Sequence, residues 1–142
     1  MAPKVSFDEV TVGDEIPVHT KVVKRQDVKA YADASGDQNP LHQDDAFAQS
    51  VGFPGIIAHG MFTMAHLTSG LTAWLGDPSA LKDLKVQFRA AVFMDETIEA
   101  GGRVAGLDPG SKQATLEVWV KVDRAGVSEH PIKNSQAIVQ LA

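Results

Sequence analysis

Two short segments of the sequence carry side chains suited to acid–base chemistry. The first, residues 35–42, reads SGDQNPLH and places Asp37 and His42 on either side of Pro40. Because Asn39 precedes that proline, it is pushed out of the α-helical region, and the segment is predicted to be a turn. A turn can bring a carboxylate and an imidazole to the same side of the backbone. Such a pair can exchange protons with water near neutral pH, as addition or removal of water beside a carbonyl group requires.

The second segment is His59-Gly60-Met61, which opens an apolar run that extends to residue 75. The first N–H groups of a helix have no partner within it and carry partial positive charge. With no side chain at Gly60, a substrate oxygen can approach closely. We therefore expect the Gly60 N–H to stabilise an oxygen that gains negative charge during a reaction. On spacing alone, a capped turn with a solvated histidine and an ordinary turn glycine remain alternatives.

Together these segments resemble the MaoC-like family. The pattern Asp-x-Asn-Pro-x-His, followed by Ala46-Phe47-Ala48 and then by Ile57-Ala58-His59-Gly60-Met61, is specific in combination. The resemblance covers residues 7–142. Residues 74–78 and 86–90 look most like the catalytic subunit of the mycobacterial-type (3R)-hydroxyacyl-ACP dehydratases.

The resemblance implies a function as well as a fold. It implies a hydro-lyase, either an (R)-specific enoyl-CoA hydratase or a (3R)-hydroxyacyl-thioester dehydratase of fatty acid metabolism. The catalytic residues would be Asp37 and His42, with the Gly60 N–H as oxyanion donor and with Asn39 and His59 supporting the turn or the substrate. This chemistry requires no metal or redox cofactor, and none is expected. Which of Asp37 and His42 is the base and which the acid stays open.

Composition narrows the class of protein. The 142 residues suffice for a single domain, residues 1–142. The formal net charge is −5, without a stripe of Lys and Arg, which argues against a nucleic-acid partner. The sequence has no cysteine, so neither disulfides nor thiolate chemistry are expected. Residues 1–5 have no apolar secretion core, and the apolar stretch 61–75 is too short and too polar to span a bilayer. We therefore expect a cytoplasmic protein with no membrane contact.

The first half of the chain is predicted to be mostly helical. After a turn at Gly13-Asp14 and a strand within 18–24, a short helix over 26–34 should end at Ser35-Gly36. A second short helix, capped by Asp44 or Asp45, should run to Ser50 and stop at Gly52. Phe47 and Val51 are expected to pack in the interior. The helix over 61–75 is apolar almost all round, which predicts burial on most sides.

The second half is predicted to be antiparallel strands. Val86, Phe88, Ala90 and Val92 alternate with more polar neighbours, and residues 97–107 form a second strand with a bend at Gly101-Gly102. Alternation over 116–122 and the segment 132–141 give two more strands. The fold class is thus α+β, a curved antiparallel sheet wrapped around a long central helix. The resemblance implies the same arrangement, the hot-dog fold.

Partners and rival functions follow from these expectations. The substrate would be an acyl-CoA or an acyl-ACP, and a free sheet edge predicts a homodimer or a heterodimer with a related hot-dog subunit. One alternative is a non-catalytic acyl-binding subunit of a heterodimeric dehydratase, although both Asp37 and His42 are present. Another is a hot-dog acyl thioesterase. A metal site at His59 and His66 is rejected, because His66 is more simply a core or interface residue.

Overall fold

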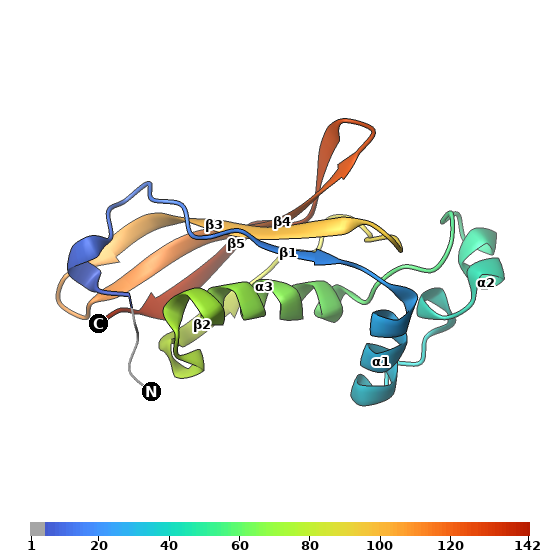
Figure 1. Ribbon diagram of the computed structural model, residues 1–142, viewed down its shortest axis with the longest axis horizontal. Coiled ribbons are helices and arrows are strands. Elements are labelled where there is room, and N and C mark those ends of the chain that lie inside the picture. Colours follow the sequence, from blue (N-terminus) through green and yellow to red (C-terminus); the bar gives the residue numbers. More distant parts are fainter. Residues whose placement is uncertain (1–4) are drawn as a thin grey trace.

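The computed structural model describes residues 5–142 (Figure 1). Residues 1–4 lie outside the described part. The expectation that residues 1–5 have no apolar secretion core therefore falls mostly on residues that the structure does not describe. The α-helices are α1 (Arg25–Ser35), α2 (Asp45–Ser50) and α3 (Gly60–Leu75). The strands are β1 (His19–Val22), β2 (Leu81–Lys85), β3 (Thr97–Asp108), β4 (Gln113–Arg124) and β5 (Val127–Gln140).

A five-stranded antiparallel sheet, in the order β1-β3-β4-β5-β2, curves over α3. Strand β4 is central, and its alternating residues Leu116, Val118, Val120 and Val122 are almost fully buried in the core cluster that includes Leu67, Leu71 and Leu75 of α3. Helices α1 and α2 lie together beyond one end of the sheet (Figure 1). The α+β arrangement of a curved sheet around a long helix is therefore confirmed.

Helix α3 is buried on one face rather than on most sides. Phe62, Leu67, Leu71 and Leu75 are in the core, whereas a strip of four residues faces outward: Met61, Ala65, Ser69 and Ala73. The strip follows the four-residue repeat of one helix face. The expectation of burial nearly all round was wrong for the single chain, because the sheet covers only one side of the helix.

The strand predicted over 86–92 is absent, and the strand that leads into this region is β2, over residues 81–85. Beyond Lys85 the chain makes only isolated contacts with β5, among them a bridge between Phe88 and Ile132. The cause is in β5, where the register shifts between Ser135 and Ile132 and Asn134 has a φ of 52°. Beyond the kink β5 still pairs with β4, but residues 86–96 pair with β5 only at isolated positions and form an irregular segment.

The bend in β3 is also displaced from its predicted place. The register with β4 shifts between Val104 and Gly106, not at Gly101-Gly102. Gly101 instead makes room for Trp119, since a Cβ at Gly101 would lie 2.8 Å from the Trp119 indole nitrogen. The glycine pair thus permits close side-chain packing and not a change of strand direction.

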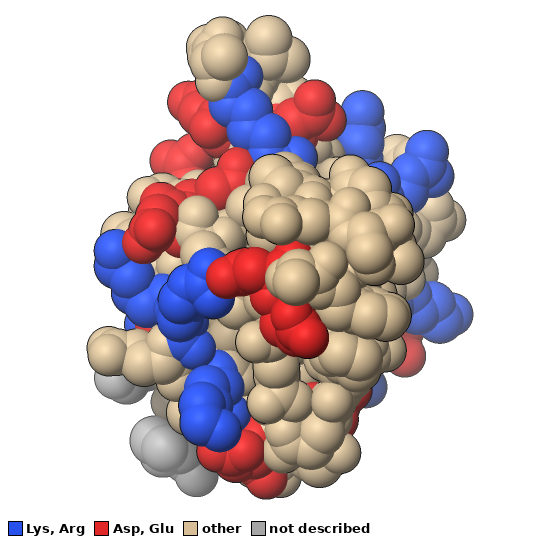
Figure 2. Space-filling view, turned by 90° about the vertical axis from the view of Figure 1, so that its right-hand side faces the viewer, with Lys and Arg blue, Asp and Glu red and all other residues tan. Residues whose placement is uncertain are grey.

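The two short helices have the predicted ends. Helix α1 ends at Gly36, whose φ of 78° is left-handed, and the Asp44 carboxylate caps α2 by accepting the N–H groups of Ala46 and Phe47. Phe47 and Val51 do not pack inside, however, and are 40% and 53% exposed. The end of the molecule formed by α1 and α2 carries a broad area without charged side chains (Figure 2).

No helix within residues 5–142 is long and apolar enough to cross a membrane.

Candidate functional site

The turn after α1 is built from its own polar groups. The Asp37 N–H donates to Ser35 Oγ at 3.2 Å, and the Asn39 N–H donates to Asp37 Oδ1 at 3.2 Å. The Asn39 side chain in turn accepts the Leu41 N–H at 3.0 Å, while its own ψ of 131° is extended, as predicted for a residue before proline. Asn39 therefore shapes the turn and helps orient the Asp37 carboxylate, whose residue is exposed.

His42 is fixed by one hydrogen bond to the segment before α3. Its Nδ1 lies 2.7 Å from the carbonyl oxygen of Ile57. A carbonyl oxygen can only accept, so Nδ1 carries a proton, and in the neutral form of the ring Nε2 has a free lone pair. In this tautomer His42 can take a proton from a water molecule at Nε2.

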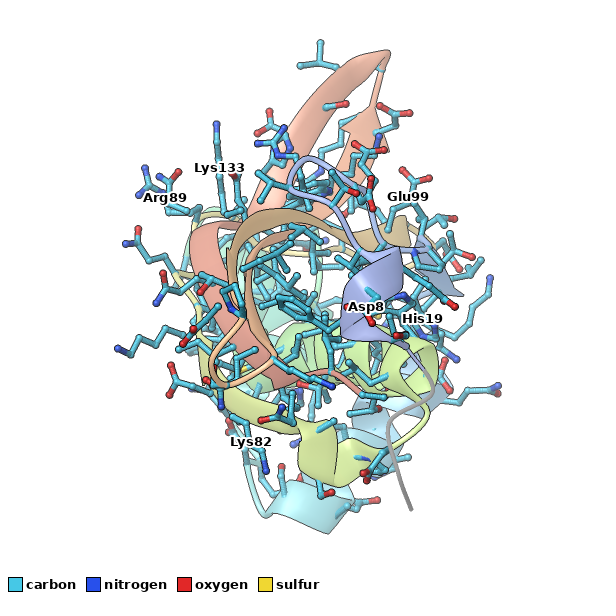
Figure 3. The ribbon with its side chains drawn as sticks, turned by 90° about the vertical axis from the view of Figure 1, so that its left-hand side faces the viewer. Asp8, His19, Lys82, Arg89, Glu99 and Lys133 are labelled. Atoms are coloured by element: carbon cyan, nitrogen blue, oxygen red, sulfur yellow. The ribbon has the colours of Figure 1, made fainter. Side chains whose placement is uncertain are left out.

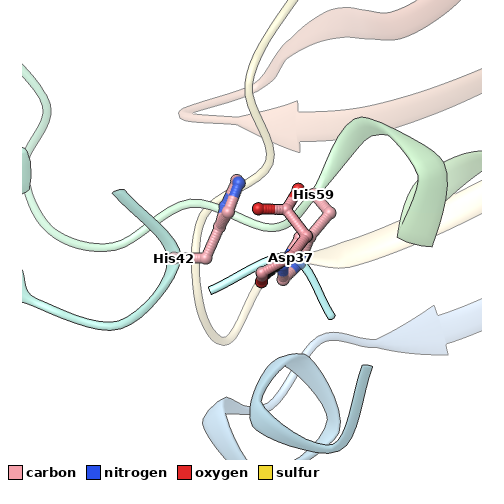
Figure 4. A group of neighbouring side chains, drawn as sticks. All are labelled: Asp37, His42 and His59. Atoms are coloured by element: carbon pink, nitrogen blue, oxygen red, sulfur yellow. Dashed lines mark hydrogen bonds between the residues drawn. The ribbon is translucent and has the colours of Figure 1, made fainter. Parts of the chain in front are cut away.

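His59 contacts both of these residues, and the three side chains lie close together (Figure 4). It precedes α3 as its N-cap residue and is only 2% exposed. Its Nε2 lies 3.1 Å from the carbonyl oxygen of Asp37, and its ring stacks on that of His42 with centroids 3.7 Å apart. Asp37, His42 and His59 are thereby brought together from two segments of the chain.

The donor atoms of these three side chains lie within 4.8 Å of one another. One carboxylate and two imidazoles are a set that divalent transition metals can use. The stacked rings, at an interplanar angle of 23°, direct their in-plane lone pairs along nearly parallel planes. An ion would therefore require one ring to turn, whereas a water molecule between Asp37 and His42 would not.

Gly60 opens α3 beside the pair and lines a pocket of about 350 Å³ together with His42, Phe88, Val92 and Pro131. The first N–H groups of α3 lack partners inside the helix and lie at its positive end. Gly60 leaves little spare space, because a Cβ there would lie 3.2 Å from the Phe88 ring. The start of α3 and the His42 imidazole thus lie next to each other at the same pocket.

Asp45 ties the three segments that meet at the site. Its carboxylate accepts two hydrogen bonds from Arg25 of α1, the closer at 2.8 Å, and the N–H of Ile56 at 2.9 Å. The hydrogen bonds from Arg25, followed by the one from Ile56, lower the pKa of Asp45. Asp45 therefore stays ionised at neutral pH and links α1, α2 and the segment that leads to His59.

Two neighbours of the site were not singled out as site residues by the sequence. Tyr31 contacts the His59 ring with centroids 4.9 Å apart, and Phe88 faces Gly60. Tyr31 was recognised only as part of a helix face, and Phe88 only as part of a strand pattern. Neither local pattern indicates a contact with residues so distant in the sequence.

His66 lies outside this site, half-buried on α3 against Phe62 at 4.7 Å and stacked on His19 at 6.3 Å. Burial, followed by the charges of Lys21 and His19, lowers the pKa of His66, although Asp27 acts in the opposite direction. It is a packing residue within this chain, as expected.

No Lys or Arg among residues 5–142 lines the pocket beside Gly60, and the cations Arg89, Lys133 and Lys82 do not form one cluster. Arg89 and Lys133 extend from the same side of the molecule, while Lys82 lies well below them (Figure 3).

A larger surface hollow of about 510 Å³ is lined by Lys85, Gln87, Thr115, Glu117, Asn134 and Gln136, none of which belongs to the site described above.

Comparisons with known proteins show the family of the chain. The profile of the MaoC like domain matches residues 4–125. The chain belongs to the MaoC-like family. A relative from Rhodospirillum rubrum, named (R)-specific enoyl-CoA hydratase, is 30% identical over 82% of this chain and 81% of its own length. A relative from Methylorubrum extorquens, named 3-hydroxybutyryl-CoA dehydratase, is 28% identical over 95% of this chain and 83% of its own length.

Solved structures place the MaoC-like chain in the hot-dog fold. It superposes on an (R)-hydratase from A. caviae with a TM-score of 0.82 at 26% identity, covering 94% of this chain and 98% of that one. A protein named MaoC-like dehydratase gives a TM-score of 0.89 at 35% identity, and there the chain spans 44% of the longer protein. Hydratases and dehydratases of this family are hydro-lyases, and the chain is an enzyme of that class.

Proposed function

We propose that the protein adds water reversibly to trans-2-enoyl thioesters, giving (3R)-hydroxyacyl thioesters, and catalyses the reverse dehydration. The observation that carries the proposal is the convergence of the Asp37 carboxylate and the His42 imidazole, within 4.8 Å, beside a pocket that Gly60 also lines. The names of the relatives in the family support the same reaction. The acyl group would be carried on CoA or on an acyl carrier protein.

In the proposed mechanism Asp37 and His42 bind one water molecule between them. During hydration one group removes a proton from the water as its oxygen attacks the β-carbon, and a proton is returned to the α-carbon. His42 suits the base role, since its Nε2 has a free lone pair in the tautomer fixed by Ile57. The negative charge that develops on the thioester oxygen would be met by the Gly60 N–H at the start of α3.

We also propose that the working enzyme is a pair of hot-dog subunits, either two copies or this chain with a related one. Apolar side chains around the site support this, since Met61 is 54% and Phe88 49% exposed in the single chain. Large exposed apolar residues gathered in one region mark a surface that another chain covers.

One assay tests the reaction. The purified protein is incubated with crotonyl-CoA while the enoyl absorbance and the release of free thiol are followed. Loss of the enoyl absorbance without thiol release is expected, and coupling to an (R)-specific 3-hydroxyacyl-CoA dehydrogenase should consume the product. Thiol release would indicate a thioesterase. No reaction, with the protein alone or with a related subunit, would favour an acyl-binding subunit.

A further inference from the structure

His59 has contacts on three sides that a simple turn residue would not need. Its Nε2 faces the carbonyl oxygen of Asp37 at 3.1 Å, and one ring neighbour is His42 at 3.7 Å between centroids. Another is Tyr31 of α1, at 4.9 Å and an angle of 56°. One buried imidazole therefore contacts both residues of the acid–base pair and the helix that precedes them.

The hydrogen-bond acceptors determine where each proton is. Because the Asp37 carbonyl can only accept, His59 carries its proton on Nε2, while His42 carries its proton on Nδ1 toward Ile57. The two stacked histidines thus donate from different ring nitrogens, His42 from Nδ1 and His59 from Nε2. His59 Nδ1 is then a bare lone pair, buried and without a hydrogen-bond partner among residues 5–142.

A buried nitrogen without a partner costs stability and calls for a reason. Phenylalanine would fill the same space between His42 and Tyr31 without leaving any polar atom unpaired. What phenylalanine cannot provide is the N–H that reaches the Asp37 carbonyl. The donor toward Asp37 is therefore the property that distinguishes histidine from an apolar ring at this position.

We propose that His59 is a positioning residue: its Nε2–H fixes the Asp37 turn, while its ring, supported by Tyr31, fixes His42. The acid and the base are thus set at one separation by a single neutral side chain that does not itself exchange protons with substrate. The expected effect on rate rests on the proposed hydratase function. The tautomers and contacts do not, and they can be measured separately.

Two substitutions separate the donor from the ring. His59→Phe keeps a flat ring and removes the N–H, whereas His59→Gln keeps an N–H donor and removes the ring. We expect His59→Phe to retain or raise the melting temperature, because the unpaired nitrogen is gone and the exposed Asp37 turn can bind water. Its kcat should fall about 10- to 100-fold with little change in KM, since small misplacement of catalytic groups costs rate. His59→Gln should recover part of that loss, because it restores the donor to Asp37 but not the ring that contacts His42.

His66→Phe is the matched control, with the same substitution at a half-buried histidine of α3 outside the site. It should leave kcat unchanged. A fully active His59→Phe, or a His59→Gln as slow as His59→Phe, would show that the donor to Asp37 does not position the site.

Nitrogen-15 NMR of the imidazole groups at about pH 8, where free histidine is neutral, gives an independent readout. We expect His59 to be protonated on Nε2 and His42 on Nδ1, and His59→Phe to leave the His42 tautomer unchanged. A proton on Nδ1 of His59 would overturn the proposal. If Asp37→Asn or His42→Ala kept full activity while these tautomers were found, the proposed reaction would fail and the structural role of His59 would stand.

Discussion

At the scale of single residues, Asp37 and His42 differ in how they are restrained. The Asp37 carboxylate is on an exposed residue and bonds within its own turn, while the His42 ring is partly buried and bonds to Ile57, fifteen positions further along the chain. Removing either functional group should leave the core intact, because neither belongs to it. Effects on rate and on stability can therefore be separated at both positions.

Asp37→Asn or His42→Ala should lower the hydration rate at least about a hundredfold, the usual effect of losing an acid–base group. Turnover of crotonyl-CoA measured beside thermal melts checks this. Asp33→Asn, the same charge change within α1, is the matched control and should remain active. Near-normal turnover in either site variant would exclude the assigned chemistry.

Gly60 can be tested through its neighbour Phe88. The Cβ of Gly60→Ala would lie 3.2 Å from the Phe88 ring, so either the ring or the start of α3 must shift. We expect a loss of about a hundredfold in kcat, comparable to losing one oxyanion donor, without a large fall in melting temperature. Combining Gly60→Ala with Phe88→Leu should restore part of the rate. A fully active Gly60→Ala would mean that this backbone does not bind the thioester oxygen.

At the scale of elements, local rules succeed where an element is bounded by its own residues. Gly36 ends α1, Asp44 caps α2, and Asn39-Pro40 keeps the chain between Asp37 and His42 from forming an α-helix, so that only a single 3-10 turn, Pro40–His42, occurs there. The segment 86–96 shows where such rules fail. Alternation over 86–92 predicts a strand, yet the ladder of β2 with β5 ends at Lys85, next to the kink that β5 makes at Asn134, far along the chain. The contacts of Tyr31 and Phe88 with the site are missed for the same reason.

Residues 86–96 are fixed at both ends by side chains of the sheet. Ser135 Oγ accepts the Gln87 N–H at 2.9 Å near the beginning. At the end, Arg124 donates to the Glu96 carboxylate at 2.7 and 2.8 Å and to the Ala91 carbonyl at 2.6 Å. Burial acts to raise the pKa of Glu96, but the hydrogen bonds, led by those from Arg124, outweigh it and lower that pKa.

Arg124→Lys should lower the melting temperature at neutral pH by several degrees, because lysine cannot make the forked contact with Glu96 and Ala91. A lowered Glu96 pKa in the folded state contributes stability at neutral pH that is lost as pH falls through that pKa. The difference in melting temperature between Arg124→Lys and the wild type should therefore become smaller at acidic pH. Arg103→Lys, which alters an exposed pair with Glu117, is the control and should have little effect. An equal fall in melting temperature for both variants would contradict the role of Arg124 in fixing residues 86–96.

At the scale of the whole molecule, residues 5–142 leave two sheet edges, β1 and β2, and one face of the central helix uncovered. Helix α3 contains no Asp, Glu, Lys or Arg along its sixteen residues. A helix with one solvated face ordinarily carries charges there. The outward strip of Met61, Ala65, Ser69 and Ala73 is instead uncharged and mostly small, which permits close approach of another chain.

We therefore expect the protein to sediment as a dimer or a larger assembly. Ser69→Arg, in the middle of the strip, should weaken association, because it adds a long charged side chain to the interface. In the wild-type assembly Ala65, one helical turn away, should be shielded from solvent. Val127→Arg is the matched control, because Val127 is 60% exposed at the β4–β5 turn, away from α3. Sedimentation across a range of concentrations distinguishes the cases. If Ser69→Arg had the same mass in solution as the wild type, the interface would lie at a sheet edge and not at this strip. If the wild type were a monomer at every concentration and fully active on crotonyl-CoA, one chain would complete the site by itself.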